Sequence, residues 1–445
     1  MGHVFPRHSK SKLPTAVAGD GCYIADQNGK RYLDACCGAA VSCLGHSDQN
    51  VQEAIKSQTD KLSFAHSGFF TSEPAEELAD LLIANAPEGI DRVYFVSGGS
   101  EAVEAALKLA RQYHLERGED QRSHVIARWQ SYHGNTIGAL SAGGNKWRRE
   151  PFMPMLVPMS HIDPCYPYRD QTEGESDEDY GLRAANRLEE EILKVGAKNV
   201  SAFICEPVVG ATMGAVAAAP GYLKRIREIC DQYGVLLILD EVMCGMGRTG
   251  TLFACEHDEV APDIICIAKG LGAGYQPIGA MLCSKKIYSA IENGSGFFQH
   301  GHTYQAHPTA CAAGLAVLTT LLERDLLTNV RHRSEQLMKA LTDAFGQHPH
   351  VGDIRGRGLF IALELVKDRD TKEPFDPVLA IHARIKKAAF ELGLMCYPMP
   401  GTIDGKNGDH ILLAPPFIIE DQHVDEIVEK LSQSFAMLDE LSVAD

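Results

Sequence analysis

Residues 235–242 read Val-Leu-Leu-Ile-Leu-Asp-Glu-Val, an apolar run followed by two acidic residues, Asp240 and Glu241. A second run, Ile264–Ala268, is equally apolar and is followed directly by Lys269. Runs of this length without alternating polar residues are typical of strands that are buried on both faces of a parallel sheet. The two segments therefore predict an α/β fold, with an acidic and a basic side chain at the ends of two strands.

Further segments extend the predicted sheet and supply its covering helices. We expect strands at Arg92–Val96, Val125–Ala127, Ala202–Cys205 and Gly279–Cys283. All but the first are predicted to be parallel, buried strands like the two above. Apolar residues at helical spacing predict a helix over Glu101–His114, and Gly221–Tyr233 is expected to be a helix between two strands. This alternation of strands and helices predicts a sheet covered on both faces.

The ends of the chain have a different pattern. Residues 21–34 are predicted to form a hairpin with Asn28-Gly29 as its turn. Beyond Arg324, helices such as Asn329–Phe345 alternate with strands such as Gly358–Leu365. We therefore expect a large domain over residues 61–325 and a smaller α+β domain built from residues 1–60 and 326–445. The acidic stretch at residues 171–180 is predicted to be a solvated loop or an insertion.

Composition excludes several classes of protein. The chain has 445 residues, a formal net charge of −17 and a pI near 5.5, which disfavours nucleic acid and anionic membrane surfaces as partners. Its 13 cysteines include no Cys-x-x-Cys pair, so neither a zinc site nor a redox motif is indicated. Residues 1–14 are polar and basic rather than apolar, and we expect no signal peptide and a cytoplasmic protein.

Three strand ends carry candidate chemistry, and each has a simpler interpretation. After Val96, the glycines of Ser97-Gly98-Gly99-Ser100 could turn the backbone so that helix N–H groups face a phosphate, or Ser100 could belong to an ordinary helix cap. Asp240 could pair with a cofactor's pyridinium nitrogen, or it could cap the next turn. Lys269 could be a desolvated amine that attacks a carbonyl, or a lysine extending to solvent.

Two other patterns are interpreted as incidental. Residues 245–250 match G-x-G-x-x-G, but the match starts too far from the end of the strand and no clear helix follows, so no dinucleotide site is predicted. His300, His302 and His307 are close together in the sequence. We interpret them as surface or packing residues, and we predict no metal site.

Taken together, these motifs resemble those of the class III aminotransferases. The resemblance rests on Leu239-Asp240-Glu241-Val242, Gly247-Arg248-Thr249-Gly250, Pro262-Asp263 and Lys269-Gly270, with the expected spacing from Asp240 to Lys269. It covers nearly the whole chain, and the subgroup it is most similar to is the ω-amino acid:pyruvate type. The resemblance implies a transferase of fold type I that depends on pyridoxal phosphate, with a mostly parallel seven-stranded sheet.

The same resemblance implies a role for each matching residue. Lys269 would form the Schiff base and act as general base, and Asp240 would keep the pyridine nitrogen protonated. Val242 and Tyr132 would contact opposite faces of the ring. The remaining implied cofactor residues are Gly99 and Ser100 at the phosphate, His133 beside Tyr132, Glu206 near the phenolic side, and Thr303 reaching the phosphate from a second subunit. A homodimer with shared sites, or a tetramer, would follow.

The sequence departs from the subgroup where a substrate carboxylate would bind. An arginine commonly lies before a Gly-Asp pair there, but residues 402–409 contain none, and only Lys406 or another arginine such as Arg148 could replace it. We therefore expect amino transfer from an amine or ω-amino acid to pyruvate or another 2-oxo acid. An aminomutase or an amino-acid racemase is the alternative, and a decarboxylating relative is a weaker one. Phe69 and Phe70 could line the donor pocket or pack in the core.

Overall fold

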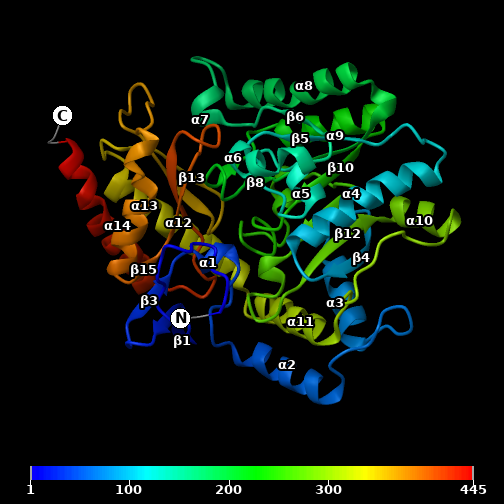
Figure 1. The fold of residues 1–445 in the computed structure, drawn as a ribbon, viewed down its shortest axis with the longest axis horizontal. Helices are drawn as coiled ribbons and strands as arrows, with labels where there is room; N and C mark the ends of the chain where they lie inside the picture. The colour runs from blue at the N-terminus through cyan, green and yellow to red at the C-terminus, as the bar shows by residue number, and fades with distance from the viewer. Residues whose placement is uncertain (1–2, 443–445) are drawn as a thin grey trace.

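A seven-stranded sheet forms the centre of the computed structural model, which describes residues 3–442. Its order is β4-β12-β11-β10-β7-β5-β6, and β12 runs against the other strands (Figure 1). The predicted, mostly parallel sheet is therefore confirmed. The strands span Ile90–Val96 (β4), Gly279–Ser284 (β12), Ile264–Ile267 (β11), Leu236–Asp240 (β10), Val200–Cys205 (β7), His124–Arg128 (β5) and Ser160–Ile162 (β6).

The prediction that Gly279–Cys283 is a parallel strand was wrong. Strand β12 pairs antiparallel with both β11 and β4. A parallel connection needs a crossover long enough to return the chain to the same edge, which is usually a helix. Between β11 and β12 the chain has only the short 3-10 helix Lys269–Leu271, so it reverses direction instead.

Helices cover both faces of the sheet, as the alternating pattern predicts. Successive side chains of a strand point to opposite faces. Accordingly, Leu236 packs in the core beneath α4 and α10, whereas Leu237 packs in the core beneath α8 and α9. These helices span Gly99–Glu116 (α4), Lys285–Asn293 (α10), Asp177–Val195 (α8) and Tyr222–Tyr233 (α9). Other helices are Gln49–Lys61 (α2), Glu73–Ala84 (α3), Ile137–Ala142 (α5), Lys146–Arg149 (α6) and Pro308–Glu323 (α11).

The N-terminal strands and the elements of the C-terminal segment lie together on the side of the molecule away from this sheet (Figure 1). The predicted hairpin is present, because β2 pairs antiparallel with β3 and Gly29 adopts a φ of 80° between them. Strand β3 in turn pairs with β15, so N-terminal and C-terminal segments share one sheet. The strands of these two terminal segments are Ala16–Asp20 (β1), Tyr23–Asp26 (β2), Arg31–Asp34 (β3), Val351–Gly356 (β13), Ile361–Leu365 (β14), Leu394–Met395 (β15), Tyr397–Pro400 (β16) and Asp409–Leu413 (β17).

Three helices accompany these strands at the C-terminal end. They span Leu326–Phe345 (α12), Ile381–Glu391 (α13) and Asp421–Ser442 (α14). The predicted helix at Asn329–Phe345 is therefore confirmed, although it begins three residues earlier. The domain limits at residues 60 and 325 stay a prediction.

The acidic stretch at residues 171–180 is only partly a loop, which corrects the prediction. Helix α8 begins at Asp177, and the Ser176 hydroxyl accepts the N–H of Asp179 at 3.1 Å. Acidic residues in the first turn of a helix are favoured by the positive end of its dipole. The acidic residues from Asp177 onward therefore mark the start of a helix, and an insertion at this stretch stays a prediction.

The structure also tests the glycine pattern at residues 245–250 and the state of the cysteines. Residues 245–250 form turns, and the next helical element is the 3-10 helix Ala254–Asp258, so the glycine pattern precedes no dinucleotide-binding helix. The cysteines are all buried with free thiols, and burial raises the pKa of Cys205 to about 12. Across residues 3–442, no helix has both the length and the apolar character that crossing a membrane requires.

Candidate active site

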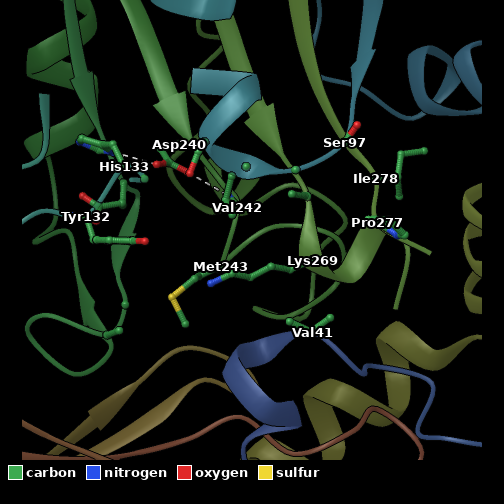
Figure 2. Close-up of a pocket in the computed structure, with 18 of the residues that line it drawn as sticks. Val41, Ser97, Tyr132, His133, Asp240, Val242, Met243, Lys269, Pro277 and Ile278 are labelled. Atoms are coloured by element: carbon green, nitrogen blue, oxygen red, sulfur yellow. Dashed lines mark hydrogen bonds and ion pairs between the residues drawn. The ribbon is translucent and has the colours of Figure 1, made fainter. Parts of the chain in front are cut away.

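The carboxyl ends of β4, β10 and β11 open into one cavity of about 460 Å³, where ligands bind in open α/β sheets. Figure 2 shows side chains from these strands and from neighbouring loops converging on it. Every predicted cofactor residue except Thr303 lines the cavity, namely Gly99, Ser100, Tyr132, His133, Glu206, Asp240, Val242 and Lys269.

Lys269 projects into this cavity from the end of β11 (Figure 2). Its backbone adopts a φ of 45°, a conformation that is uncommon outside glycine. Burial lowers the pKa of its amine to about 8, although the nearby charge of Asp240 acts in the opposite direction. A minority of the amine, roughly a tenth at pH 7, is therefore neutral and so nucleophilic, whereas an amine with the ordinary value would be almost fully charged.

Asp240 ends β10 with only 3% of its surface exposed. Its Oδ1 accepts the N–H of Val242 at 3.0 Å, and its Oδ2 lies 2.7 Å from Nδ1 of His133 (Figure 2). Strand pairing sets Asp240 opposite Cys266, three residues before Lys269. The register of two neighbouring strands thus brings the carboxylate and the amine to the same cavity.

His133 is buried between two carboxylates. Burial lowers its pKa, but the charge of Glu206 and the hydrogen bond with Asp240 outweigh this, and the net effect is a raised pKa. Its Nε2 is buried and has no hydrogen-bond partner among residues 3–442. The geometry therefore favours a proton on His133 and a negative charge on Asp240.

The start of α4 forms a backbone cradle on another side of the cavity. Within the described chain, no hydrogen bond uses the N–H groups of Gly99 and Ser100, so both are available to an anion at the positive end of the helix. A Cβ added to Gly99 would lie 2.8 Å from Cγ1 of Val242. Glycine is required at position 99 because the helix start and Val242 pack directly together.

Tyr132 and Glu206 form a third side. The N–H of Tyr132 donates to Oε1 of Glu206 at 3.0 Å, and Nη2 of the buried Arg128 lies 3.5 Å from Oε2 of the same carboxylate. The guanidinium of Arg148 lies 4.7 Å from the centre of the Tyr132 ring. Glu206 is therefore held between a backbone donor and a cation, and it fixes the loop that carries Tyr132.

Thr303 is the predicted residue that this chain does not bring to its own cavity. It lies in an exposed turn between Gly301 and Ala306. The two phenylalanines considered for the donor pocket do not line this cavity either, and both are exposed, Phe69 to 81% and Phe70 to 70%. The alternative that they pack in the core of this chain is therefore wrong.

The sequence did not indicate several other residues that line the cavity. Val41 comes from the N-terminal segment just after α1 (Cys37–Ala40), and Gln276, Pro277 and Ile278 come from the reversal between β11 and β12 (Figure 2). The glycines that follow Lys269 could have indicated Gln276, Pro277 and Ile278, because glycines there favour a backbone that comes close to a ligand. Nothing local marks Val41, whose position depends on the fold of the whole chain.

These groups match the parts of pyridoxal phosphate. Two unpaired N–H groups suit the phosphate, the buried carboxylate of Asp240 suits a protonated ring nitrogen, and the amine of Lys269 suits the aldehyde. All three open into one cavity, so the residues present fit the cofactor.

Comparisons with known proteins agree with this geometry. The family model for class-III aminotransferases matches residues 4–435. An uncharacterized aminotransferase of Schizosaccharomyces pombe is 46% identical over 433 residues, which are 97% of this chain and 94% of that protein. A putrescine–pyruvate aminotransferase of Pseudomonas aeruginosa is 35% identical over 410 residues, which are 92% of this chain and 87% of that protein.

Solved structures of transaminases are also similar to this chain. An (S)-enantioselective omega-transaminase of Thermomicrobium roseum has a TM-score of 0.92 and 34% identity, covering 98% of this chain and 96% of that one. An amine transaminase of an uncultivated Pseudomonas species, solved with pyridoxal phosphate, has a TM-score of 0.91 and 37% identity, covering 98% and 99%. These names favour amino transfer over the aminomutase or racemase alternative. The chain belongs to the class-III aminotransferases, enzymes that depend on pyridoxal phosphate.

Proposed function

We propose that this aminotransferase moves an amino group from an amine or ω-amino acid to pyruvate or another 2-oxo acid, with Lys269 as its catalytic residue. The amine of Lys269 supports this most directly, because its lowered pKa places it, partly neutral, in the same cavity as Asp240. The omega-transaminase and putrescine–pyruvate aminotransferase among the similar proteins support the class of donor and acceptor.

The bound cofactor supplies a ring that withdraws electrons from the substrate carbon and so makes its proton acidic. In the proposal, Asp240 holds a proton at the ring nitrogen, and His133 keeps that carboxylate oriented and charged. Gly99 and Ser100 hold the phosphate through their N–H groups. Val242 and Tyr132 contact opposite faces of the ring. Glu206 positions the loop that carries Tyr132.

Lys269 moves the proton in this scheme. Its Nζ would accept a proton from the substrate carbon that carries the amino group and would donate a proton to the carbon on the other side of the transferred nitrogen, which requires the amine to change between its neutral and charged forms during turnover. A pKa near 8 allows both forms at physiological pH, whereas an amine with the ordinary value of 10.5 would be almost fully charged. Desolvation of the Lys269 amine in the cavity therefore supports its proposed role in moving the proton.

We further propose a cytoplasmic homodimer in which Thr303 completes the partner's site. Its exposed turn lies outside the cavity of its own chain, as a residue that acts across an interface would. Mixed dimers of Lys269→Ala and Thr303→Ala chains test this sharing. Each variant alone should be impaired, and mixing should restore activity at sites that combine an intact Lys269 with the partner's intact Thr303. No gain on mixing would contradict it.

Amino transfer is tested by incubating the holoenzyme with candidate amines or ω-amino acids and pyruvate. Formation of alanine with loss of the donor amine is the expected result, and Lys269→Ala should form none. A product from a single substrate without consumption of an oxo acid would indicate an isomerase instead. The absence of transfer from any donor to any 2-oxo acid would overturn the proposal.

A further inference from the structure

A second, larger chamber of about 880 Å³ lies around α6 and β16, next to the active-site cavity. Six arginine and lysine side chains line it, and we call it the basic chamber; they are Arg7, Lys146, Arg148, Arg149, Lys386 and Lys406. Glu150 is the one carboxylate among its lining residues. Such a concentration of positive charge is unexpected in a chain whose formal net charge is −17.

These cations form no close ion pairs among the described residues, although the charge of Lys146 acts on the carboxylate of Asp404. Across residues 3–442, none of the six forms an ion pair with a carboxylate, whereas Lys387, next to Lys386 on α13, pairs with Glu391 at 3.8 Å. The buried Arg149 of the same chamber differs, because it donates to the backbone carbonyls of Leu140, Ser141 and Gly143. The chamber therefore presents a positive potential that favours an anion.

Arg148 connects the chamber to the active site. Its half-buried guanidinium lies 4.7 Å from the ring centre of Tyr132, and Tyr132 itself lines the first cavity. Its backbone N–H donates to Oδ1 of Asn145 at 3.1 Å, which fixes the start of α6. A guanidinium stacked on an aromatic ring keeps its N–H edge available for a carboxylate.

The chamber also offers apolar surface. Both tryptophans of the chain, Trp129 and Trp147, line it together with Met153 and Pro398. Trp147 is 60% exposed, so it has contact area available for a ligand. Apolar walls with a few charged groups are typical of sites for small organic molecules that have an apolar body and a charged end.

We propose that the basic chamber binds the far, anionic end of the substrate, a carboxylate carried on an extended aliphatic or aromatic chain. Arg148 is the main anchor because it is half-buried and adjoins the cofactor cavity, and Lys406 and Lys386 strengthen the positive field. This inference rests on the proposed amino transfer and specifies its substrate class. It also explains how a carboxylate could bind although residues 402–409 contain no arginine, because Lys406 from that segment and Arg148 from α6 line one chamber.

The test compares two donors that differ in one carboxylate, 6-aminohexanoate and hexylamine, with pyruvate as acceptor. The measured quantity is the ratio of their kcat/KM values in the holoenzyme. Wild type should favour the acid, and Arg148→Gln should lower the ratio by about tenfold or more, as expected for loss of a charged hydrogen-bond donor. Arg148→Lys should lower it less, because the charge remains without the planar fork.

The double variant Lys386→Gln/Lys406→Gln should lower the ratio by a smaller factor. Added salt should reduce the wild-type preference, since exposed charges are screened. Lys387→Gln is the matched control, because it removes a lysine that lies on the same helix and outside the chamber. Calorimetric titration of the holoenzyme with hexanoate gives a readout without turnover, and its affinity should fall in Arg148→Gln.

The outcomes separate this inference from the proposed function. Failure of both donors in wild type, while another amine still gives alanine, would overturn the chamber proposal and leave amino transfer standing; failure of every donor would overturn amino transfer. Turnover of both donors with a ratio that Arg148→Gln leaves unchanged would overturn the chamber proposal alone. A change of oligomeric state in the Lys386→Gln/Lys406→Gln variant with an unchanged ratio would assign the chamber to contacts between copies of the chain, and so also overturn it.

Discussion

Nδ1 of His133 lies 2.7 Å from Oδ2 of Asp240, and each side chain is at most 3% exposed. A carboxylate so far from water is costly unless a cation or hydrogen-bond donor compensates it. The His133 ring is that donor, and the N–H of Val242 is another. The pair therefore explains how a charged Asp240 can persist at the end of a buried strand, where the proposed mechanism needs it.

Replacement of Asp240 by asparagine tests the proposed role of its charge. The amide keeps the shape but cannot hold a proton at the ring nitrogen, so we expect kcat to fall by roughly a hundredfold or more. Steady-state kinetics with pyruvate as acceptor measures the loss, and far-ultraviolet circular dichroism checks the fold. A variant with wild-type kcat would contradict the assignment. Asp231→Asn, on the exposed part of α9, is the control.

The histidine of the pair should make stability depend on pH. The pKa of His133 is raised in the folded protein above its ordinary value of 6.5. The charged pair therefore contributes stability that is fully present below that value and is lost as pH rises through the raised pKa. We expect His133→Gln to lose more free energy of unfolding at pH 6 than at pH 9, measured by denaturant titration of the apoenzyme. An equal loss at both values would contradict this pairing.

The lowered pKa of Lys269 should govern cofactor incorporation. The neutral amine is the form that attacks an aldehyde, so the rate at which apoenzyme takes up pyridoxal phosphate should rise with pH and level off above about 8. The visible absorption of lysine-bound cofactor follows this rate. Lys269→Ala should never develop that band without an added amine. A rate that keeps rising toward pH 10.5 would show that the amine is not desolvated.

Packing at the helix start gives a prediction about stability. A Cβ on Gly99 would lie 2.8 Å from Val242, so Gly99→Ala should cost about 1–3 kcal/mol of apoenzyme stability through overpacking. Denaturant titration measures the cost. In a Val242→Ala background the same substitution should cost less, because the opposing methyl groups are gone. Gly98→Ser is the matched control, since its added Cβ meets no atom within 4 Å and its extended φ of 177° suits any residue.

Local sequence determined much of this protein. Unbroken apolar runs identified the buried strands β10 and β11, because only a strand covered on both faces tolerates them. The residue after each run then gave Asp240 and Lys269, since strand ends face the ligand side of an open sheet. The hairpin at Asn28-Gly29 and the alternating elements after Arg324 were also predicted, and β3 pairs with β15 across these two segments.

Other features depended on the tertiary structure. The antiparallel direction of β12 follows from a short reversal that its apolar residues do not reveal. Val41 reaches the cavity, and Arg148 and Lys406 reach one chamber, only because segments far apart in sequence pack together. The partner of Asp240 was likewise hidden, since His133 is 107 residues away along the chain. The pattern of apolar residues in the sequence predicts whether a side chain is buried. Which side chain it then contacts is decided by how the whole chain packs.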